Sequence, residues 1–243
     1  MKTTYEKAYH RLEKEHFWFK ARRKYILDTI ARADRNSRIL DIGCSSGILL
    51  HELIQLGFKK ENLFGIDISA QAIENCKASG LDNTFVMDAQ HISLNEQFDI
   101  IIASDCLEHL KEDETALKNW RQLLKPDGTA YIFVPAFMSL WSHHDVVNMH
   151  YRRYRGKELN EKLRNNGFNI QKSGFWNVFL FLPIFLYRWI SRLMPTRKSG
   201  TGNLDKLPPF NKFLIGLLSL ENRIVRHIRF PFGVSCYAFV KKS

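Results

Sequence analysis

The feature that most restricts the fold of this chain is a regular alternation of short apolar runs with helical patterns, which begins near residue 37. Runs rich in Ile, Leu, Val and Phe predict buried strands, and apolar residues at helical spacing between them predict helices. Such alternation favours a parallel sheet that helices cover on both faces. The strands are expected at residues 38–42, 63–67, 84–87, 98–103, 129–134, 168–172 and 234–241, and the main helices at 47–57, 69–79, 112–125 and 157–166.

The predicted fold class is therefore α/β, with a doubly wound, mostly parallel, seven-stranded sheet. The pattern divides the chain into an N-terminal helical lead at residues 1–36, a core at 37–174, an apolar and basic helical insertion at 175–230, and a final strand at 231–243 that returns to the core. A hydrophobic content of 45% over 243 residues is ample for a packed core.

Positive charge is concentrated in the C-terminal part of the chain. Residues 151–243 contain 18 Lys and Arg against 4 Asp and Glu, a net charge of +14, whereas residues 1–150 carry a net charge of −3. A strongly basic segment is typical of proteins that bind a polyanion, here nucleic acid or an anionic membrane surface. A solvated basic face without a partner is the alternative.

The insertion begins with an apolar stretch, residues 175–187, which a proline and two following arginines leave short of the roughly 20 residues needed to span a bilayer. Residues 210–228 then resume an apolar helical pattern that ends among arginines. Two apolar segments rimmed by arginine favour an interfacial membrane anchor. A helical cap on the sheet and a dimer interface are the alternatives.

The start of the chain has no apolar core of signal-peptide length, and the four cysteines form no C-x-x-C pair. Both observations favour a cytoplasmic protein with reduced thiols. If the insertion binds a membrane, the protein is expected to be peripheral at its inner face.

The stretch RILDIGCSSGIL after residue 37 has two interpretations. Gly43, Ser45 and Gly47 fit the G-x-S-x-G turn of hydrolases, but that turn needs earlier strands to supply an oxyanion loop, and here it follows the first predicted strand. A cofactor loop needs instead an acidic residue at the end of the next strand for the ribose hydroxyls, and Asp67 meets this requirement. Asp41 would repel a pyrophosphate, so the ligand should carry an ammonium or a sulfonium group.

With these residues the stretch resembles the first motif of the class I S-adenosylmethionine-dependent methyltransferases, with Ser45 where a glycine is usual. We expect Ser45 to adopt a negative φ angle and its hydroxyl to reach the methionine carboxylate. The resemblance covers residues 37–172, including FDII at 98–101 and LKPDG at 124–128. It implies a Rossmann-like methyltransferase fold, S-adenosyl-L-methionine as cofactor, and cofactor contacts from Asp41, Gly43, Ser45, Gly47, Asp67, Ile68, Asp88, Ala89 and Ser104.

Motifs outside the cofactor loop resemble a narrower group. HFWF at residues 16–19 and HYRRY at 150–154 are similar to motifs of HFWF/HxRRY-type bacterial and archaeal methyltransferases of mostly unassigned substrate, many of them associated with glycan and lipid-linked sugar biosynthesis. The group is distantly similar to ubiquinone-pathway O-methyltransferases, in which an arginine of the N-terminal helix reaches the methionine carboxylate. By that similarity, Arg22 is a further cofactor residue.

The ubiquinone-pathway resemblance also implies a metal site, because Asp105, Glu108 and His109 resemble the E-x-x-E-H cluster that holds a divalent ion in those enzymes. Oxygen and imidazole ligands suit magnesium, manganese or zinc. A purely structural role for this segment is the alternative.

Histidines near the predicted strand ends could remove the proton of an acceptor hydroxyl, since the pKa of imidazole lies near neutrality. His150, His144 and His109 are the candidates. His150 is preferred because Arg152 and Arg153 beside it could hold an anionic group, although both arginines could also be surface residues and His150 structural. The predicted substrate-binding residues are Trp18, Tyr151, Arg152 and Arg153.

Together these inferences predict an S-adenosylmethionine-dependent methyltransferase that methylates an oxygen of a lipidic or lipid-linked, anionic acceptor at the membrane surface. The alternative is an RNA or protein methyltransferase that binds its substrate with the basic C-terminal half. A methyltransferase-like protein without catalysis is a third hypothesis, which the presence of the acidic and glycine residues of the cofactor motifs disfavours.

Overall fold

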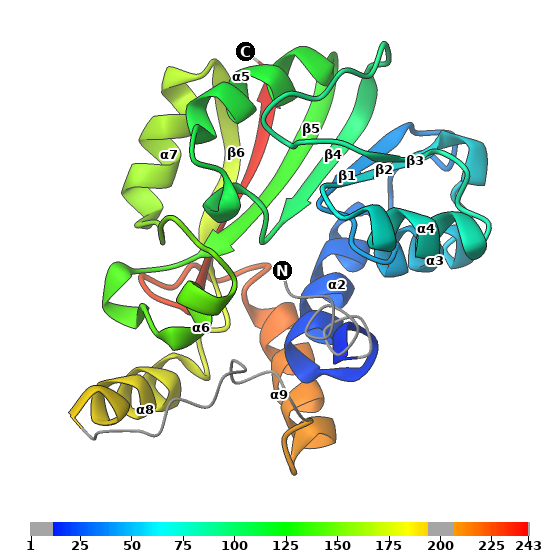
Figure 1. Ribbon diagram of the computed structural model, residues 1–243. Coiled ribbons are helices and arrows are strands. Elements are labelled where there is room, and N and C mark those ends of the chain that lie inside the picture. The colour runs from blue at the N-terminus through cyan, green and yellow to red at the C-terminus, as the bar shows by residue number, and fades with distance from the viewer. Residues whose placement is uncertain (1–11, 194–206, 243) are drawn as a thin grey trace.

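The computed structural model describes residues 12–193 and 207–242, and its centre is a twisted sheet (Figure 1). Its strands are β1 (Ile39–Ile42), β2 (Leu63–Asp67), β3 (Thr84–Val86), β4 (Phe98–Ser104), β5 (Leu124–Pro135), β6 (Phe168–Trp176) and β7 (Ser235–Lys242). They form one seven-stranded sheet in the order β3-β2-β1-β4-β5-β7-β6. Only β7 runs antiparallel to its neighbours. The predicted mostly parallel α/β sheet is confirmed.

The central strands are apolar on both sides because helices cover both faces of the sheet. All four residues of β1 are buried, and successive residues point to opposite faces. Leu40 and Ile42 belong to one core cluster, together with α5 (Asp113–Leu123) and α7 (Gly156–Asn165). Ile39 belongs to the other cluster, with α2 (Phe17–Ile30), α3 (Ile48–Gln55) and α4 (Ala70–Ala78).

The turn between α5 and β5 differs from the prediction. The helix expected at residues 112–125 ends at Leu123, and β5 begins directly at Leu124. The pairing with β4 then passes from Phe98–Leu124 to Ile100–Thr129, so the Pro-Asp-Gly turn bulges out of the strand. A local turn signal cannot show that the strand already pairs before the turn.

The insertion contains two helices, α8 (Phe181–Leu193) and α9 (Asn211–Ile224), which lie below the sheet in Figure 1. The apolar stretch 175–187 is divided between the sheet and α8, because β6 continues to Trp176 before α8 begins. The expected domain boundary at residue 175 therefore falls inside a strand.

α9 packs against α2 as a helical cap. Asn222 Nδ2 donates to the carbonyl of Ala21 at 2.9 Å, and its Oδ1 accepts a bond from the indole of Trp176 at 2.8 Å. Buried Glu221 accepts bonds from the backbone N–H groups of Val178 and Phe179. The lead and the insertion are thus joined to each other and to the end of β6.

None of the helices within residues 12–193 and 207–242 is long and apolar enough to cross a membrane.

A substitution at Gly47 can test how tightly the loop after β1 is packed. It has a φ of +74°, and a Cβ there would lie 2.4 Å from Leu81 Cδ1 and 3.0 Å from Cys76 Sγ, both buried. We expect Gly47→Ala to lower the free energy of unfolding by about 2–4 kcal/mol, through backbone strain and overpacking. Gly80→Ala is the control, since Gly80 has a φ of +88° with open space around it, and should cost about 1 kcal/mol. Equal losses in urea titrations would show that packing at Gly47 contributes nothing.

Candidate functional site

A cavity of about 1310 Å³ opens at the carboxyl ends of the parallel strands. Asp41 and Asp67 line it from β1 and β2, and Ser104 lines it from β4. The lead contributes Trp18 from α2, and α8 contributes Ile184. This edge of a doubly wound sheet is where such folds bind their ligands.

The structure brings most of the predicted cofactor residues to this cavity. Gly47 is the exception, because it lies behind the loop as the N-cap of α3 and contributes packing rather than lining. The predicted cofactor residues that do line the cavity are Arg22, Asp41, Gly43, Ser45, Asp67, Ile68, Asp88, Ala89 and Ser104.

The glycine loop is fixed to the end of β2. The backbone N–H of Gly43 donates to the carbonyl of Ile66 at 2.8 Å, and the carboxylate of Asp67 accepts the N–H groups of Ser45 at 3.0 Å and Ser69 at 2.9 Å. The acid expected to meet a ribose thus also sets the shape of the loop.

Ser45 differs from the prediction in two ways. Its φ is +47°, the left-handed region, instead of the negative angle expected, at a cost of about 1–2 kcal/mol relative to glycine. Its hydroxyl donates to Glu13 Oε2 at 2.8 Å rather than standing free for a ligand. The turn after β1 needs a positive φ whatever residue occupies it, which is why glycine is the usual choice.

Three carboxylates converge on this loop. Asp41 is only 4% exposed, and burial, followed by the charges of Glu13 and Asp67, raises its pKa to about 8. A ligand with positive charge would relieve this repulsion. The sequence analysis missed Glu13, and the one signal for it was an acidic residue three positions before the HFWF motif.

Arg22 also lines the cavity, and its side chain is 2% exposed. Its Nη1 donates to both carboxylate oxygens of Asp105 at 3.2 Å, and its Nη2 donates to Ser235 Oγ at 2.7 Å. The guanidinium carbon lies 4.3 Å from the ring centroid of Trp176. A fixed guanidinium, paired with Asp105, therefore borders the cavity.

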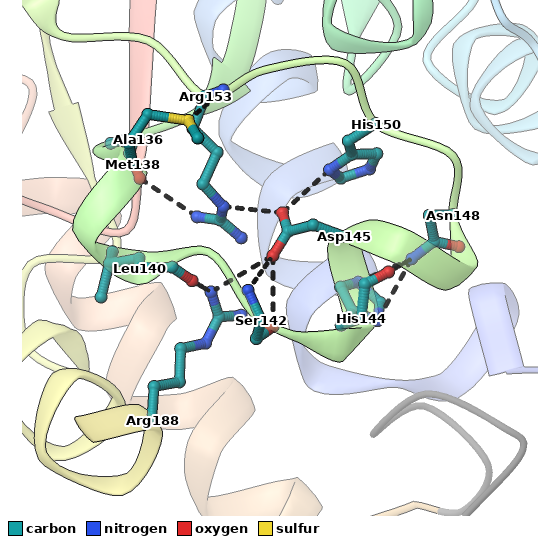
Figure 2. A network of polar contacts seen from close by, with 10 residues as sticks. All are labelled: Ala136, Met138, Leu140, Ser142, His144, Asp145, Asn148, His150, Arg153 and Arg188. Carbon is teal, nitrogen blue, oxygen red and sulfur yellow. Dashed lines mark hydrogen bonds and ion pairs between the residues drawn. The ribbon is translucent and has the colours of Figure 1, made fainter. Parts of the chain in front are cut away.

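Asp145 is the centre of a second polar network, on the segment after β5 (Figure 2). The fully buried carboxylate accepts bonds from His150 Nδ1 at 3.0 Å, Arg153 Nε at 2.6 Å and the N–H of Ser142 at 2.8 Å. Arg188 Nη1, from α8, lies 3.9 Å from its Oδ2 and also bonds to the carbonyl of Leu140. Burial alone would raise the pKa of Asp145, but the hydrogen bond from His150 and the charge of Arg153 hold it well below its usual range.

The three histidines proposed as bases all line the cavity, in different surroundings. Burial lowers the pKa of His144 to about 4, so it is neutral at physiological pH, whereas His109 is exposed. The His144 ring contacts the side-chain amide of Asn148, whereas His150 is oriented by Asp145.

The predicted metal ligands are regrouped by the structure. Asp105 is bound to Arg22, while Glu108, His109 and His150 offer ligand atoms that lie within 4.8 Å of one another. Glu108 is fully buried, neither carboxyl oxygen has a hydrogen-bond partner in the described part of the chain, and burial followed by Asp105 raises its pKa well above the usual range. These three side chains could bind a divalent cation. Their arrangement is also consistent with a protonated Glu108.

Of the predicted substrate residues, Trp18, Tyr151 and Arg153 line the cavity and Arg152 does not. Arg152 is turned away, because its Nη1 pairs with Asp113 at 2.8 Å and its Nη2 bonds to the carbonyl of Lys111 at 2.7 Å. The structure therefore gives no support to the prediction that Arg152 contacts substrate.

Arg188 lines the cavity, whereas Arg152 does not. Arg188 was not among the site residues predicted from the sequence. Its signal in the sequence was a charge that ends an apolar run.

The family model described as "Methyltransferase domain" matches residues 14–173, more than half of the chain, and the chain therefore belongs to this family. Among curated proteins, the ubiquinone biosynthesis O-methyltransferase of Nitrosococcus oceani is 34% identical over 101 residues, which cover 39% of this chain and 42% of that protein. That of Haemophilus ducreyi is 28% identical over 117 residues, 44% of this chain and 48% of that protein. The chain thus matches less than half the length of these relatives.

Solved structures with the same fold include a SAM-dependent methyltransferase from Archaeoglobus fulgidus, with a TM-score of 0.60, 20% identity and coverage of 97% of this chain and 99% of that one. The plantazolicin methyltransferase BamL, in complex with SAH and a triazolic desmethylPZN analog, has a TM-score of 0.58 and 17% identity, over 97% and 90% of the two chains. At these identities the similarity shows the fold alone. Family and fold together confirm the class I S-adenosylmethionine-dependent methyltransferase predicted from the sequence.

The residues present fit S-adenosylmethionine. The cofactor carries a sulfonium and an ammonium, which suit a loop bordered by Asp41, Asp67 and Glu13. Its methionine carboxylate suits the side of the cavity that Arg22 borders. When bound, the cofactor supplies an electrophilic methyl group.

The pKa of Asp41 gives a test of the acidic loop without any acceptor. Between about pH 5 and pH 8 the folded, cofactor-free protein retains a proton that the unfolded chain has released, so its free energy of unfolding should fall as the pH rises. Asp41→Asn should remove this dependence, a difference on the order of 3 kcal/mol between the two pH values in urea titrations. Asp127→Asn, on an exposed turn, is the control. The same pH dependence in wild type and Asp41→Asn would contradict the assignment.

Proposed function

We propose that the protein transfers a methyl group from S-adenosylmethionine to an oxygen of a lipidic or lipid-linked, anionic acceptor at the membrane surface. The observation that carries the proposal is the composition of one cavity. It is bordered by the acidic cofactor loop, by the Asp145–His150 pair and by an apolar helix that is exposed on its outer side.

The Asp145–His150 pair supports an oxygen acceptor. Because His150 Nδ1 donates to the Asp145 carboxylate, Nε2 keeps its lone pair and can accept the proton of a hydroxyl while the acceptor oxygen takes the methyl group. The buried carboxylate would then stabilise the imidazolium. His150 is therefore the base that we propose, in preference to His144 and His109.

The two sides of α8 support a lipidic acceptor. Ile184 and Arg188 line the cavity, whereas Leu182, Leu186 and Trp189 on the outer side are 60%, 45% and 53% exposed. Packing against its own domain buries only one side of α8, so the apolar side chains of the outer side stay exposed. Exposed apolar surface of this kind is typical of helices that lie in a membrane interface.

The start of α9 adds to the same apolar surface. Phe210 and Phe213 are exposed, and Lys212 between them is exposed as well. Helices α8 and α9 both extend from the same end of the molecule (Figure 1). An apolar surface with a basic residue suits an anionic lipid surface.

Two arginines support an anionic group on the acceptor. Arg153 and Arg188 both line the cavity, and both lie beside the carboxylate of Asp145. Two guanidinium groups at the cavity suit an anionic group on the acceptor.

The RNA or protein alternative has less support, because several basic side chains of the C-terminal half are engaged within the protein. Arg152 and Lys162 pair with Asp113, and Arg226 pairs with Asp28. These side chains hold α7 and α9 in place instead of forming an open basic surface.

We also propose Glu108, His109 and His150 as ligands of a divalent cation. When bound, the cation would lower the pKa of an acceptor hydroxyl as a Lewis acid. As a cation ligand through Nε2, His150 would not be the base, so the two roles can be separated by experiment.

The acceptor class can be tested with labelled cofactor and a membrane lipid extract. We expect label in lipid and none in added RNA. His150→Gln should lower kcat by about 100-fold or more while leaving the affinity for S-adenosylhomocysteine unchanged in calorimetry. His143→Gln, exposed on α6 (His143–Val147), is the control and should retain activity.

The same assay with a chelator separates the two roles of His150. Activity that survives chelation supports His150 as the base. Activity that is lost and then restored by manganese supports the cation site. Full activity of His150→Gln in both conditions would contradict both assignments, and label only in RNA would replace the lipid proposal.

Membrane association can be tested by sedimentation with vesicles of phosphatidylglycerol and phosphatidylcholine. We expect wild type to sediment with them, and the double variant Leu186→Glu/Trp189→Glu to lose this binding by about 10-fold or more, because two charges would enter the interface. Val86→Glu, at an equally exposed apolar position on β3, is the control. Wild type that stays in the supernatant would refute the membrane surface.

A further inference from the structure

A second hollow, of about 600 Å³, lies between the lead and the start of α9, and we call it the α2–α9 groove. Glu15 and Lys20 line it from the lead, and Lys212 and Phe213 line it from α9. The segment 207–209 lines both this groove and the cavity. The groove therefore adjoins the cavity without being part of the cofactor site.

The two walls of the α2–α9 groove are held together by Asn211. Its Oδ1 accepts a hydrogen bond from the backbone N–H of Phe17 at 2.8 Å, and its Nδ2 donates to the carbonyl of Glu15 at 2.9 Å. The packing of α9 against α2 continues this contact along the two helices. The groove thus exists in the folded protein before any ligand binds, which lowers the entropic cost of binding.

Two lysines give the α2–α9 groove a positive charge. Lys20 and Lys212 are exposed, and neither forms an ion pair with a carboxylate of residues 12–193 and 207–242. Glu15 also lines the groove and is exposed, so two cations stand against one carboxylate. Lysine ammonium groups are common ligands of phosphate, and a carboxylate accepts hydrogen bonds from hydroxyl groups. The groove therefore suits an anionic phosphate that carries a hydroxyl group.

Apolar side chains lie beside the two lysines. Phe210 and Phe213 line the groove and are 71% and 68% exposed, and Leu207 is 39% exposed. Large apolar side chains gathered at a hollow indicate a surface that another apolar group covers. A ligand that joins an anionic phosphate to hydrocarbon fits both parts of the groove, and an anionic phospholipid has this composition.

We propose that the α2–α9 groove binds the headgroup of an anionic phospholipid of the membrane, with the lipid phosphate at Lys20 and Lys212. The acyl chains then lie against Phe210 and Phe213. Helix α8, with its exposed apolar side, extends from the same end of the molecule as α9, so one bilayer can contact both (Figure 1). The inference rests on the membrane surface of the proposed function and adds to it a selectivity for lipid charge.

The lysines can be tested by sedimentation with two kinds of vesicle, one of phosphatidylglycerol and one of phosphatidylcholine. We expect wild type to prefer phosphatidylglycerol, and Lys20→Gln/Lys212→Gln to weaken that binding by about 30-fold, because each basic residue near an anionic bilayer contributes about fivefold. The matched control is Lys14→Gln/Arg223→Gln, which removes one exposed positive charge from the lead and one from α9, both outside the groove. It should bind as wild type does.

A soluble lipid separates a phospholipid from free phosphate. We expect dihexanoylphosphatidylglycerol, below its micelle concentration, to shift the NMR signals of the Asn211 side-chain amide, and inorganic phosphate at the same concentration to leave them unchanged. Equal shifts with both would identify a site for phosphate alone and overturn the lipid assignment.

The remaining outcomes distinguish this inference from the membrane proposal. Wild type that sediments with neither vesicle would refute the membrane surface and the groove together. Equal binding of the two double variants to phosphatidylglycerol would refute the groove alone and leave the membrane surface in place. RNA binding that only Lys20→Gln/Lys212→Gln loses, with vesicle binding intact, would assign the groove to RNA instead of lipid.

Discussion

The buried guanidinium of Arg22 is the interaction on which the rest of the site depends. It joins the lead to the ends of β4 and β7 through Asp105 and Ser235, and it stacks on the ring of Trp176 at the end of β6. A charge this deeply buried is tolerated only with a paired partner, and removing one partner of such a pair costs about 3–5 kcal/mol. The lead is therefore held against the edge of the sheet by the buried ion pair of Arg22 as well as by apolar packing.

Much of the fold could be predicted from the sequence because parallel strands buried on both faces read as continuous apolar runs. The cofactor loop could also be predicted, because its spacing to Asp67 follows from the geometry of a strand, a turn and a helix. These signals are local or repeat at short range. The φ angle of Ser45 is different, because the side chain itself gives no indication of a left-handed backbone.

The parts of the site that the sequence could not give are long-range contacts. Glu108 and His150 meet because the segment after β5 folds back, with the N–H of Tyr151 donating to the Glu108 carbonyl at 2.8 Å. Arg152 and Arg153 are adjacent, but Arg152 pairs with Asp113 away from the cavity, whereas Arg153 lines the cavity and pairs with Asp145. A motif names such residues together, and only packing decides which of them faces the cavity.

The contacts of α2 with α9 and of Arg22 with Ser235 have a consequence for folding during synthesis. Residues of the lead and Val234, just before β7, line the same cavity, so a nascent chain on the ribosome holds the glycine loop and Asp67 long before it holds the residues that secure the lead. Such distant pairings form late and slowly in folding. The cofactor site should therefore be complete only after β7 has left the ribosome, and until then the side of α2 that packs against α9 is uncovered.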